Sequence, residues 1–327
     1  MKKILLTGAA GFIGYHLSDF LLNKGFEVYG LDDLNNNYDK RIKQWRISQL
    51  VGKKNFHFTK INIVSPLNLN EYFRKNFKSN KLDAIINLAA RTGVRKSTLD
   101  PDSYYRSNVI GVLNLVKLAN RYSIKSFVHA STSSVYGKSR KKNFKITDDT
   151  NRPLSNYAAS KKASEVLLYA YHMLHKQNIT ILRLFTVYGP AGRPDMSPFI
   201  FIQSSINSDP INLFGTGKQQ RDFTYVDDVI VGIYKSLKLK GYNVLNLGNN
   251  KPISINHLIV KISELSKNKI KINKKPPNPE DVPFTAANIS RTKQLIGWAP
   301  KTGIDQGLQK TLKWHLKNKE WLSKIKI

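Results

Sequence analysis

The chain has 327 residues, 41% of them hydrophobic, and no cysteine, which predicts a globular protein with a large core and excludes disulfides, thiolate metal sites and thiol nucleophiles. Lys and Arg number 53 against 22 Asp and Glu, a formal net charge of +31, and such a charge attracts nucleic acids, anionic membranes and phosphorylated ligands. Because the basic residues are scattered along the chain without interleaved aromatic side chains, a lysine-rich surface is favoured over nucleic-acid binding as the main function.

Apolar runs typical of strands alternate with helical patterns along the first half of the chain. Near-continuous apolar strands with helices between them are typical of a parallel sheet covered on both faces. We therefore predict an α/β fold built on a Rossmann-type doubly wound parallel sheet. The predicted strands are 3–8, 27–32, 56–63, 83–90, 126–132 and 179–185, and the predicted helices lie near 12–24, 67–78, 104–121 and 157–176.

The turn after the first strand is rich in glycine. In "TGAAGFIG", Gly8, Gly11 and Gly14 are spaced G-x-x-G-x-x-G between a strand and a helix. Such glycines permit a tight turn and the close approach of a phosphate, and the helix N-terminus offers free N–H groups to a pyrophosphate. Asp32 ends the second strand, where a carboxylate accepts hydrogen bonds from an adenosine ribose and repels a 2′-phosphate. With Asp33 beside it, this pattern predicts NAD rather than NADP.

The helix predicted at 157–176 begins with a tyrosine and a lysine in "YAASK". The spacing of four places Tyr157 and Lys161 on one face of that helix. A free tyrosine has a pKa of about 10, so it is a poor base near neutrality. Lowering that pKa by about three units takes roughly 4 kcal/mol, which an ammonium and a cationic nicotinamide can supply in a partly dry site. The loop before this helix starts at four successive hydroxyl side chains, residues 131–134.

The pattern of alternating strands and helices loosens after about residue 190. We predict an NAD-binding domain over 1–190 and a smaller mixed α/β substrate-binding lobe over 191–327, with a segment near 226–248 returning to the main sheet. No apolar run approaches the roughly 18 residues that span a bilayer, and no signal sequence precedes the first strand. The seven His show no metal-ligand spacing, so we expect a cytoplasmic protein without a metal site.

Four of these motifs together resemble the extended short-chain dehydrogenase/reductase family: "TGAAGFIG", "LAA" (88–90), "STSSVYG" (131–137) and "YAASK". Within that family, "LDDLNNNYD" (31–39), "GVRKS" (93–97), "LRLFTVYGPAGRPDM" (182–196) and "RDFTYVDDV" (221–229) are most similar to the UDP-glucuronate 4-epimerase subgroup. The resemblance implies reversible C4 epimerisation of UDP-glucuronate to UDP-galacturonate through a 4-keto intermediate and transient NADH, with tightly bound, recycled NAD. Two alternatives stay open: a 4-epimerase of UDP-glucose or a UDP-N-acetylhexosamine, and a non-catalytic NAD-sensing or nucleic-acid-binding protein.

The resemblance also implies roles for individual residues. Thr132, Tyr157 and Lys161 match the family's catalytic triad. Related dehydratases carry an acidic pair at 133–134 and related uronate decarboxylases carry Glu at 134, whereas this chain has serine at both positions, so simple epimerisation is the expected outcome. The residues implied for the cofactor are Gly8, Gly11, Phe12, Ile13, Gly14, Asp32, Asn35, Asn62, Ile63, Leu88, Ala89, Ala90, Asn108, Tyr157, Lys161 and Tyr188. The residues implied for the substrate are Arg95, Thr132, Ser133, Thr186, Arg193, Arg221 and Asp281.

Within the substrate set, Arg193, Thr186 and Ser133 are expected to grip the sugar carboxylate, since a guanidinium offers a planar charged fork. Arg95 and Arg221 are expected near the UDP phosphates, with a structural ion pair as the alternative.

The chain departs from the family pattern at two places. Asn62 stands where the family has an aspartate that contacts adenine, and Glu280 stands where it has a glycine. The side-chain oxygen of Asn62 can still accept a hydrogen bond, so NAD binding is expected to survive. Glu280 adds negative charge beside Asp281.

Two helices are expected to pair with their copies in a homodimer, as the resemblance implies. Apolar stripes lie along the helices predicted near 104–121 and 157–176. The side chains assigned to these stripes are Val109, Leu113, Val116, Val166, Leu167 and Tyr171.

Overall fold

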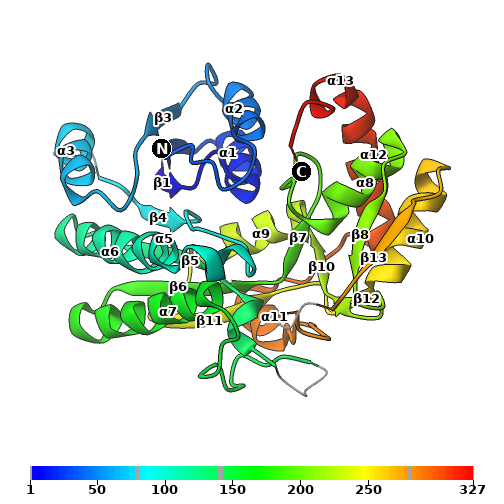
Figure 1. Cartoon of the computed structure of the whole chain (residues 1–327). Coiled ribbons are helices and arrows are strands. Elements are labelled where there is room, and N and C mark those ends of the chain that lie inside the picture. Colours follow the sequence, from blue (N-terminus) through cyan, green and yellow to red (C-terminus); the bar gives the residue numbers. More distant parts are fainter. Residues whose placement is uncertain (1, 78–80, 139–142, 278–280, 327) are drawn as a thin grey trace.

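The computed structural model of the chain describes residues 2–77, 81–138, 143–277 and 281–326. Its centre is a seven-stranded sheet in the order β11-β6-β5-β4-β1-β2-β3, in which every neighbouring pair is parallel (Figure 1). This arrangement confirms the predicted doubly wound α/β fold. The strands are β1 (Lys3–Thr7), β2 (Glu27–Asp32), β3 (Phe56–Lys60), β4 (Ala84–Asn87), β5 (Ser126–Thr132), β6 (Asn178–Leu184) and β11 (Tyr242–Leu247).

Alternation along the strands explains why helices cover both faces of the sheet. In β1, Leu5 enters one hydrophobic cluster, whereas Ile4 and Leu6 enter the other. Successive side chains of a strand point to opposite faces, so a strand that is apolar throughout needs a cover on each side. The Leu5 face packs against α3 (Pro66–Phe77), α6 (Gly111–Arg121) and α7 (Asn156–His175), and the other face packs against α1 (Phe12–Asn23) and α9 (Val226–Ser236).

Some predicted elements differ from the observed ones at their ends. The strand predicted at 83–90 ends at Asn87, because Leu88 and the two alanines after it leave the sheet. The strand predicted at 56–63 ends at Lys60. Apolar residues continue past both strands, so composition alone did not mark the point at which pairing stops.

The helix predicted near 104–121 is three consecutive elements. These are α5 (Pro101–Tyr105), a π-helical turn η1 (Arg106–Ile110) and α6. Single π turns inside helices are rare and frequently lie at functional sites. Two short helices, α2 (Lys40–Ser48) and α4 (Lys96–Leu99), were not predicted, because their sequences are mostly polar.

The remaining elements form a smaller mixed lobe beside the sheet (Figure 1). The hydrophobic core runs without a break from the sheet into this lobe, because one cluster contains Leu182 and Leu247 together with Ile202, Leu258 and Leu312. The predicted boundary at residue 190 stays a prediction. The lobe contains the parallel pairs β7 (Thr186–Tyr188) with β10 (Phe223–Tyr225) and β8 (Ile211–Phe214) with β13 (Ile272–Lys275), the antiparallel pair β9 (Gln220–Arg221) with β12 (Ile253–Ser254), and the helices α8 (Ser197–Asn207), α10 (Ile255–Ser266), α11 (Ser290–Ile296), α12 (Ile304–Lys317) and α13 (Lys319–Leu322).

Across the described part of the chain, no helix combines the length and the apolar character needed to cross a membrane. Glu280 lies outside the described residues.

Candidate active site

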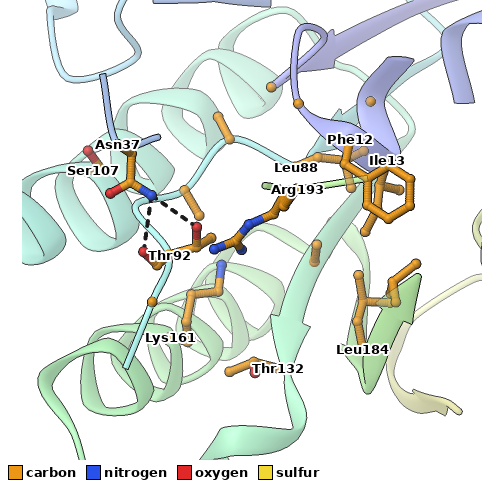
Figure 2. A pocket seen from close by; sticks show the side chains of 18 of the residues that line it. Phe12, Ile13, Asn37, Leu88, Thr92, Ser107, Thr132, Lys161, Leu184 and Arg193 are labelled. Carbon is orange, nitrogen blue, oxygen red and sulfur yellow. Dashed lines mark hydrogen bonds between the residues drawn. The ribbon is translucent and has the colours of Figure 1, made fainter. Parts of the chain in front are cut away.

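A cavity of about 350 Å³ lies beyond the carboxyl ends of the central strands. β1 has β2 on one side and β4 on the other, and this reversal of strand order is where open α/β sheets bind ligands. Figure 2 shows side chains from several elements converging on the cavity. Most of the residues predicted for the cofactor and the substrate line this cavity. They are Gly8, Gly11, Phe12, Ile13, Gly14, Asp32, Asn35, Asn62, Ile63, Leu88, Ala89, Ala90, Thr132, Ser133, Tyr157, Lys161, Thr186 and Arg193.

The glycine-rich turn has the geometry of a phosphate cradle. Gly8 has φ +74°, and its N–H donates to the carbonyl of Leu31 at 2.7 Å. A Cβ at Gly14 would lie 2.0 Å from the carbonyl oxygen of Gly8, so only glycine allows α1 to approach the turn this closely. Gly11 precedes α1 and provides no side-chain cap, which leaves the first N–H groups of the helix and its positive dipole end for an anion. The turn therefore fits a pyrophosphate.

Asp32 is buried at the end of β2, and its carboxylate is hydrogen-bonded to the glycine-rich turn. Its carboxylate accepts hydrogen bonds from the N–H groups of Ala10 (3.1 Å) and Leu34 (2.8 Å), and the ammonium of Lys43 lies 3.9 Å away. Burial raises the pKa of Asp32, and Lys43 opposes that rise. Each carboxylate oxygen has a further lone pair, so Asp32 can also accept from a ribose hydroxyl.

Sequence reasoning missed part of the cavity wall. Lys43 in α2 is buried beside Asp32 and donates to the side-chain oxygen of Asn35 at 3.1 Å. Asn37 donates to the carbonyl of Thr92 at 3.1 Å, which ties the Asn-rich loop after β2 to the loop after β4 (Figure 2). The run of three asparagines at 35–37 was the available signal. The other lining residues not predicted include Asp33, Tyr38, Gly93, Val94, Ser107, Ser131, Ser134 and Met196.

The far end of the cavity holds the three residues of the expected triad. Thr132 is the last residue of β5, and Tyr157 and Lys161 lie one turn apart at the start of α7. The hydroxyl of Thr132 accepts from the N–H of Ser134 at 3.1 Å, which stabilises the turn after β5. Tyr157 is hydrogen-bonded to Thr132. The hydroxyl cluster of the sequence therefore ends a strand and also contributes to the cavity.

The pKa of Tyr157 depends on its burial and on the groups around it. Burial raises the pKa of its phenol, while the hydrogen bond from Thr132 and the positive charge of Arg193 oppose this rise. The net direction is upward, because burial of Tyr157 itself has the largest effect. Burial also lowers the pKa of Lys161 to about 7, against the opposing effect of Glu165. The lowered pKa expected from the sequence concerned a site that also holds a cationic nicotinamide, and it stays a prediction. Without further positive charge, Tyr157 is a phenol at neutral pH.

Arg193 extends into the cavity that Lys161 also lines (Figure 2). Its Nε and Nη2 groups donate to the two carboxylate oxygens of Asp195 at 3.0 and 2.7 Å. This bidentate pair uses one edge of the guanidinium and fixes its plane, which leaves the edge formed by Nη1 and Nη2 for a second acceptor. Ser133 and Thr186 line the same cavity, so the three residues predicted for a carboxylate are brought together.

Two residues predicted to bind the cofactor do not line the cavity. Asn108 in η1 is fully buried, accepts from the N–H of Arg91 at 2.8 Å and donates to Ser160 at 2.9 Å. It joins the loop after β4 to α7, and its effect on the cofactor stays a prediction. The ring of Tyr188 packs in the core against Phe223, with a centroid distance of 6.3 Å, and its contact with the cofactor stays a prediction. A tyrosine pattern does not distinguish a core ring from a ligand contact.

Three residues predicted for the substrate also lie outside the cavity lining. Arg95 and Asp281 form an ion pair of 3.2 Å, and the Arg95 guanidinium stacks on the ring of Phe214 at 4.0 Å. Burial lowers the pKa of Arg221, and Asp281 opposes that change. The ion pair was the structural alternative for Arg95, and a role for these residues toward UDP stays a prediction.

The side-chain oxygen of Asn62 already accepts from the N–H of Val64 at 2.9 Å. It keeps a second lone pair for the predicted contact with adenine.

Residues 5–311 match the protein-family profile described as GDP-mannose 4,6 dehydratase. The chain therefore belongs to the GDP-mannose dehydratase-like group of the extended short-chain dehydrogenase/reductase family. It is 44% identical over 329 residues to UDP-glucuronate 4-epimerase from Thermodesulfobacterium geofontis, with 100% of both chains covered.

The fold of the chain is also similar to those of solved sugar-nucleotide epimerases. The structure is similar to a crystal structure of UDP-glucuronic acid 4-epimerase from Bacillus cereus in complex with UDP-glucuronic acid and NAD, with a TM-score of 0.90, 32% identity and coverage of 97% of this chain and 99% of that one. It is also similar to UDP-glucose 4-epimerase from Thermotoga maritima with UDP-glucose, with a TM-score of 0.85, 27% identity and coverage of 97% and 100%.

Proposed function

We propose that this protein is an NAD-dependent 4-epimerase that interconverts UDP-glucuronate and UDP-galacturonate. The observation that carries the proposal is a single cavity that joins the phosphate cradle to Thr132, Tyr157, Lys161 and Arg193. Hydroxyls rather than carboxyls stand at 133–134, so the cavity lacks the acid/base that the resemblance associates with dehydration and decarboxylation. The similarity to uronate epimerases over the whole chain supports the same substrate.

The residues present fit an NAD cofactor. The turn at Gly8–Gly14 and the open N-terminus of α1 would hold its pyrophosphate, and Asp32 would accept from its adenosine ribose. Lys161 would bind the second ribose from the other end of the cavity. When bound, the cofactor would supply a hydride acceptor, as NAD⁺, and a hydride donor, as NADH, beside C4 of the sugar.

The chain's own side chains handle the proton and the sugar. Tyr157 accepts the proton of the 4-hydroxyl as general base and later returns it. Thr132 holds the hydroxyl beside Tyr157. The positive charges of Lys161, Arg193 and the nicotinamide would favour the phenolate form of Tyr157, which is the form that accepts the proton. Arg193, with Ser133 and Thr186, anchors the carboxylate while the sugar presents first one face and then the other.

Product analysis tests the proposed function. The purified protein, with no cofactor added, is incubated separately with UDP-glucuronate, UDP-glucose and UDP-N-acetylglucosamine, and the products are resolved by NMR. We expect UDP-galacturonate from the first substrate and little or no turnover of the other two. A preference for UDP-glucose or UDP-N-acetylglucosamine would replace the uronate with a neutral sugar. Inactivity on all three would reject the epimerase.

We also propose that the protein is a homodimer formed through α5, η1 and α7. These elements are in contact with one another and expose apolar side chains, with Val166 58% exposed and Leu174 75% exposed. The predicted stripe was partly wrong, because Val116 is fully buried in the chain's own core. The exposed apolar residues on these elements are Tyr105, Ile110, Val166, Tyr169, Met173 and Leu174.

Light scattering at micromolar concentration should give twice the chain mass of 37.2 kDa. Val166→Glu should shift the mass toward a single chain, because it buries an unpaired charge in the interface. Lys117→Glu, on the exposed face of α6, is the control and should remain a dimer. A mass of 37.2 kDa for the unmodified protein would contradict the proposal.

The cytoplasmic location stays a prediction, as does weak or absent binding to nucleic acid despite the charge of +31. A gel shift with random duplex at increasing salt tests the latter, since binding through phosphates falls steeply with salt.

A further inference from the structure

A buried histidine lies directly beneath the chemical end of the cavity. His129 is in β5, three residues before Thr132, and has no exposed surface. Its Nε2 atom lies 3.2 Å from Nζ of Lys161 and 3.0 Å from Oγ of Ser164. Its Nδ1 atom lies 3.0 Å from the side-chain nitrogen of Asn87. Every ring nitrogen therefore has a polar neighbour, and one of them is the lysine of the expected triad.

Asn87 connects this histidine to the cofactor end of the sheet. Its side-chain oxygen accepts from the hydroxyl of Thr7 at 2.6 Å. Thr7 ends β1, immediately before the glycine-rich turn, and Asn87 ends β4. A continuous line of buried polar groups thus crosses β1, β4 and β5 and ends at Lys161. A line of this kind rigidifies the residues that it joins when all its members are satisfied.

His129 is neutral, because burial and the nearby Lys161 lower its pKa well below the usual value. A neutral imidazole has one N–H donor and one acceptor nitrogen. If Nε2 carried the hydrogen, it would face the ammonium of Lys161 as donor against donor. If Nδ1 carries it, Nε2 accepts from Lys161, and the Asn87 amide, turned by 180°, accepts from Nδ1. In that orientation the amide nitrogen of Asn87 faces the Thr7 hydroxyl and donates to it, so the direction of the bond between Asn87 and Thr7 is reversed. The Ser164 hydroxyl donates to the backbone carbonyl of Lys161 at 2.7 Å, so in this tautomer it leaves the Nε2 lone pair to the Lys161 ammonium.

We propose that His129 is a positioning residue for Lys161: a neutral imidazole, protonated on Nδ1 and held by Asn87, whose Nε2 accepts a hydrogen bond from the lysine ammonium. The role toward catalysis rests on the proposed function. A buried ammonium tends to lose its proton, and an acceptor in direct contact favours the charged form. His129 thereby keeps Lys161 both in place and charged.

The other groups near Lys161 do not take this role. Glu165 favours the charged lysine, but its carboxylate accepts from Arg183 at 3.0 and 2.8 Å and from Ser131 at 2.6 Å. Tyr157 faces the substrate side and is hydrogen-bonded to Thr132. Arg193 has no acceptor atom on its guanidinium, so it cannot accept a hydrogen bond from the ammonium. The neutral acceptor that contacts Nζ is therefore His129.

The tautomer of His129 can be measured on the unmodified protein. The nitrogen chemical shifts of its ring, in protein labelled with ¹⁵N-histidine, distinguish Nδ1–H from Nε2–H, and the spectrum of His129→Gln assigns the signals among the seven histidines. We expect a neutral ring with the hydrogen on Nδ1 across the pH range in which Lys161 is charged. A ring with its hydrogen on Nε2 throughout that range would overturn the proposal, whether or not the protein is an epimerase.

Variants test the consequence for Lys161. His129→Leu removes the acceptor, so the pKa of Lys161 falls and the loss of kcat/KM at high pH should begin about one pH unit lower. His129→Gln places an amide oxygen near the position of Nε2 and should restore most of that shift. Thr180→Val, which removes a buried polar group beside Val128 in the neighbouring strand, is the control and should keep the original pH profile.

An alkaline limb of His129→Leu identical to that of the unmodified protein would show that His129 does not support the charge of Lys161. Should this variant not fold, the tautomer measurement alone decides the proposal. If the unmodified protein turns over no UDP-sugar, the proposed function fails, and the tautomer measurement still reports on the contact between the two side chains.

Discussion

Tyr157→Phe should lower kcat on UDP-glucuronate at least about 100-fold, because general-base catalysis typically contributes 10²–10⁴-fold. The variant keeps the ring that packs edge-on against Tyr104 at 6.3 Å and removes only the oxygen that would take the proton of the 4-hydroxyl. NAD content should be unchanged, since the phosphate cradle and Asp32 lie at the other end of the cavity. The measurements are single-turnover and steady-state kinetics together with the NAD released on denaturation.

Tyr104→Phe is a matched control for this variant. It removes a neighbouring phenol whose hydroxyl donates to the carbonyls of Thr92 and Gly93 at 2.8 and 3.0 Å. That hydroxyl supports the loop after β4 and takes no part in the proposed proton transfer, so kcat should fall less than about tenfold. Near-normal turnover of Tyr157→Phe, or equal losses in both variants, would remove Tyr157 from its role as base.

The residues that the sequence predicted best are those whose positions depend on one element or one turn. Gly8, Gly11 and Gly14 sit between a strand and a helix, and Tyr157 and Lys161 lie on one face of α7. In each case a short-range rule of strand, turn or helix geometry fixes the relative positions. The parallel sheet then brings both ends into one cavity, because the carboxyl ends of its strands meet at the same edge.

Contacts between distant segments could not be predicted in this way. Asp281 pairs with Arg95 across 186 positions, and His129 meets Lys161 across 32. These pairings depend on how strands and loops are placed in three dimensions, and a single sequence carries no local pattern for them. Tyr188 illustrates the same limit: its motif implied a role at the cofactor, and nothing in the sequence showed that its ring packs in the core.

The effect of burial on the pKa values of Tyr157 and Lys161 could not be predicted from the sequence either. The sequence suggested a lowered pKa for Tyr157 from the charges of a lysine and a bound nicotinamide, but it could not show how strongly burial raises the pKa of Tyr157 and lowers that of Lys161. Desolvation disfavours the charged form of each group, and its size depends on the finished packing. The groups that oppose these shifts, Glu165 for Lys161 and Arg193 for Tyr157, are recognisable only once their positions are known.

Arg193→Ala should depress kcat/KM on UDP-glucuronate far more than on UDP-glucose. Removing one partner of a charge-assisted pair in a closed site costs roughly 2–5 kcal/mol, and a neutral hydroxymethyl group loses no such partner. The structure adds a second penalty: Asp195, which now pairs with Arg193, would be left as an uncompensated anion near the sugar carboxylate. Arg193→Lys keeps the charge but not the planar fork, so its loss on UDP-glucuronate should be intermediate.

The same variant should also release CO₂. A 4-ketouronate is a β-keto acid, and its C–COO⁻ bond breaks when that bond aligns with the π system of the ketone, giving CO₂ and a UDP-4-ketopentose. An anchored carboxylate is held out of this alignment, and loss of Arg193 lets it rotate. The assay therefore measures kcat/KM on both sugars and searches for UDP-pentose, with Asp195→Ala/Arg193→Ala as the control that removes the second anion. Equal losses on the two sugars with no pentose would mean that Arg193 does not anchor the carboxylate, and the assignment of a uronate substrate would lose its main physical support.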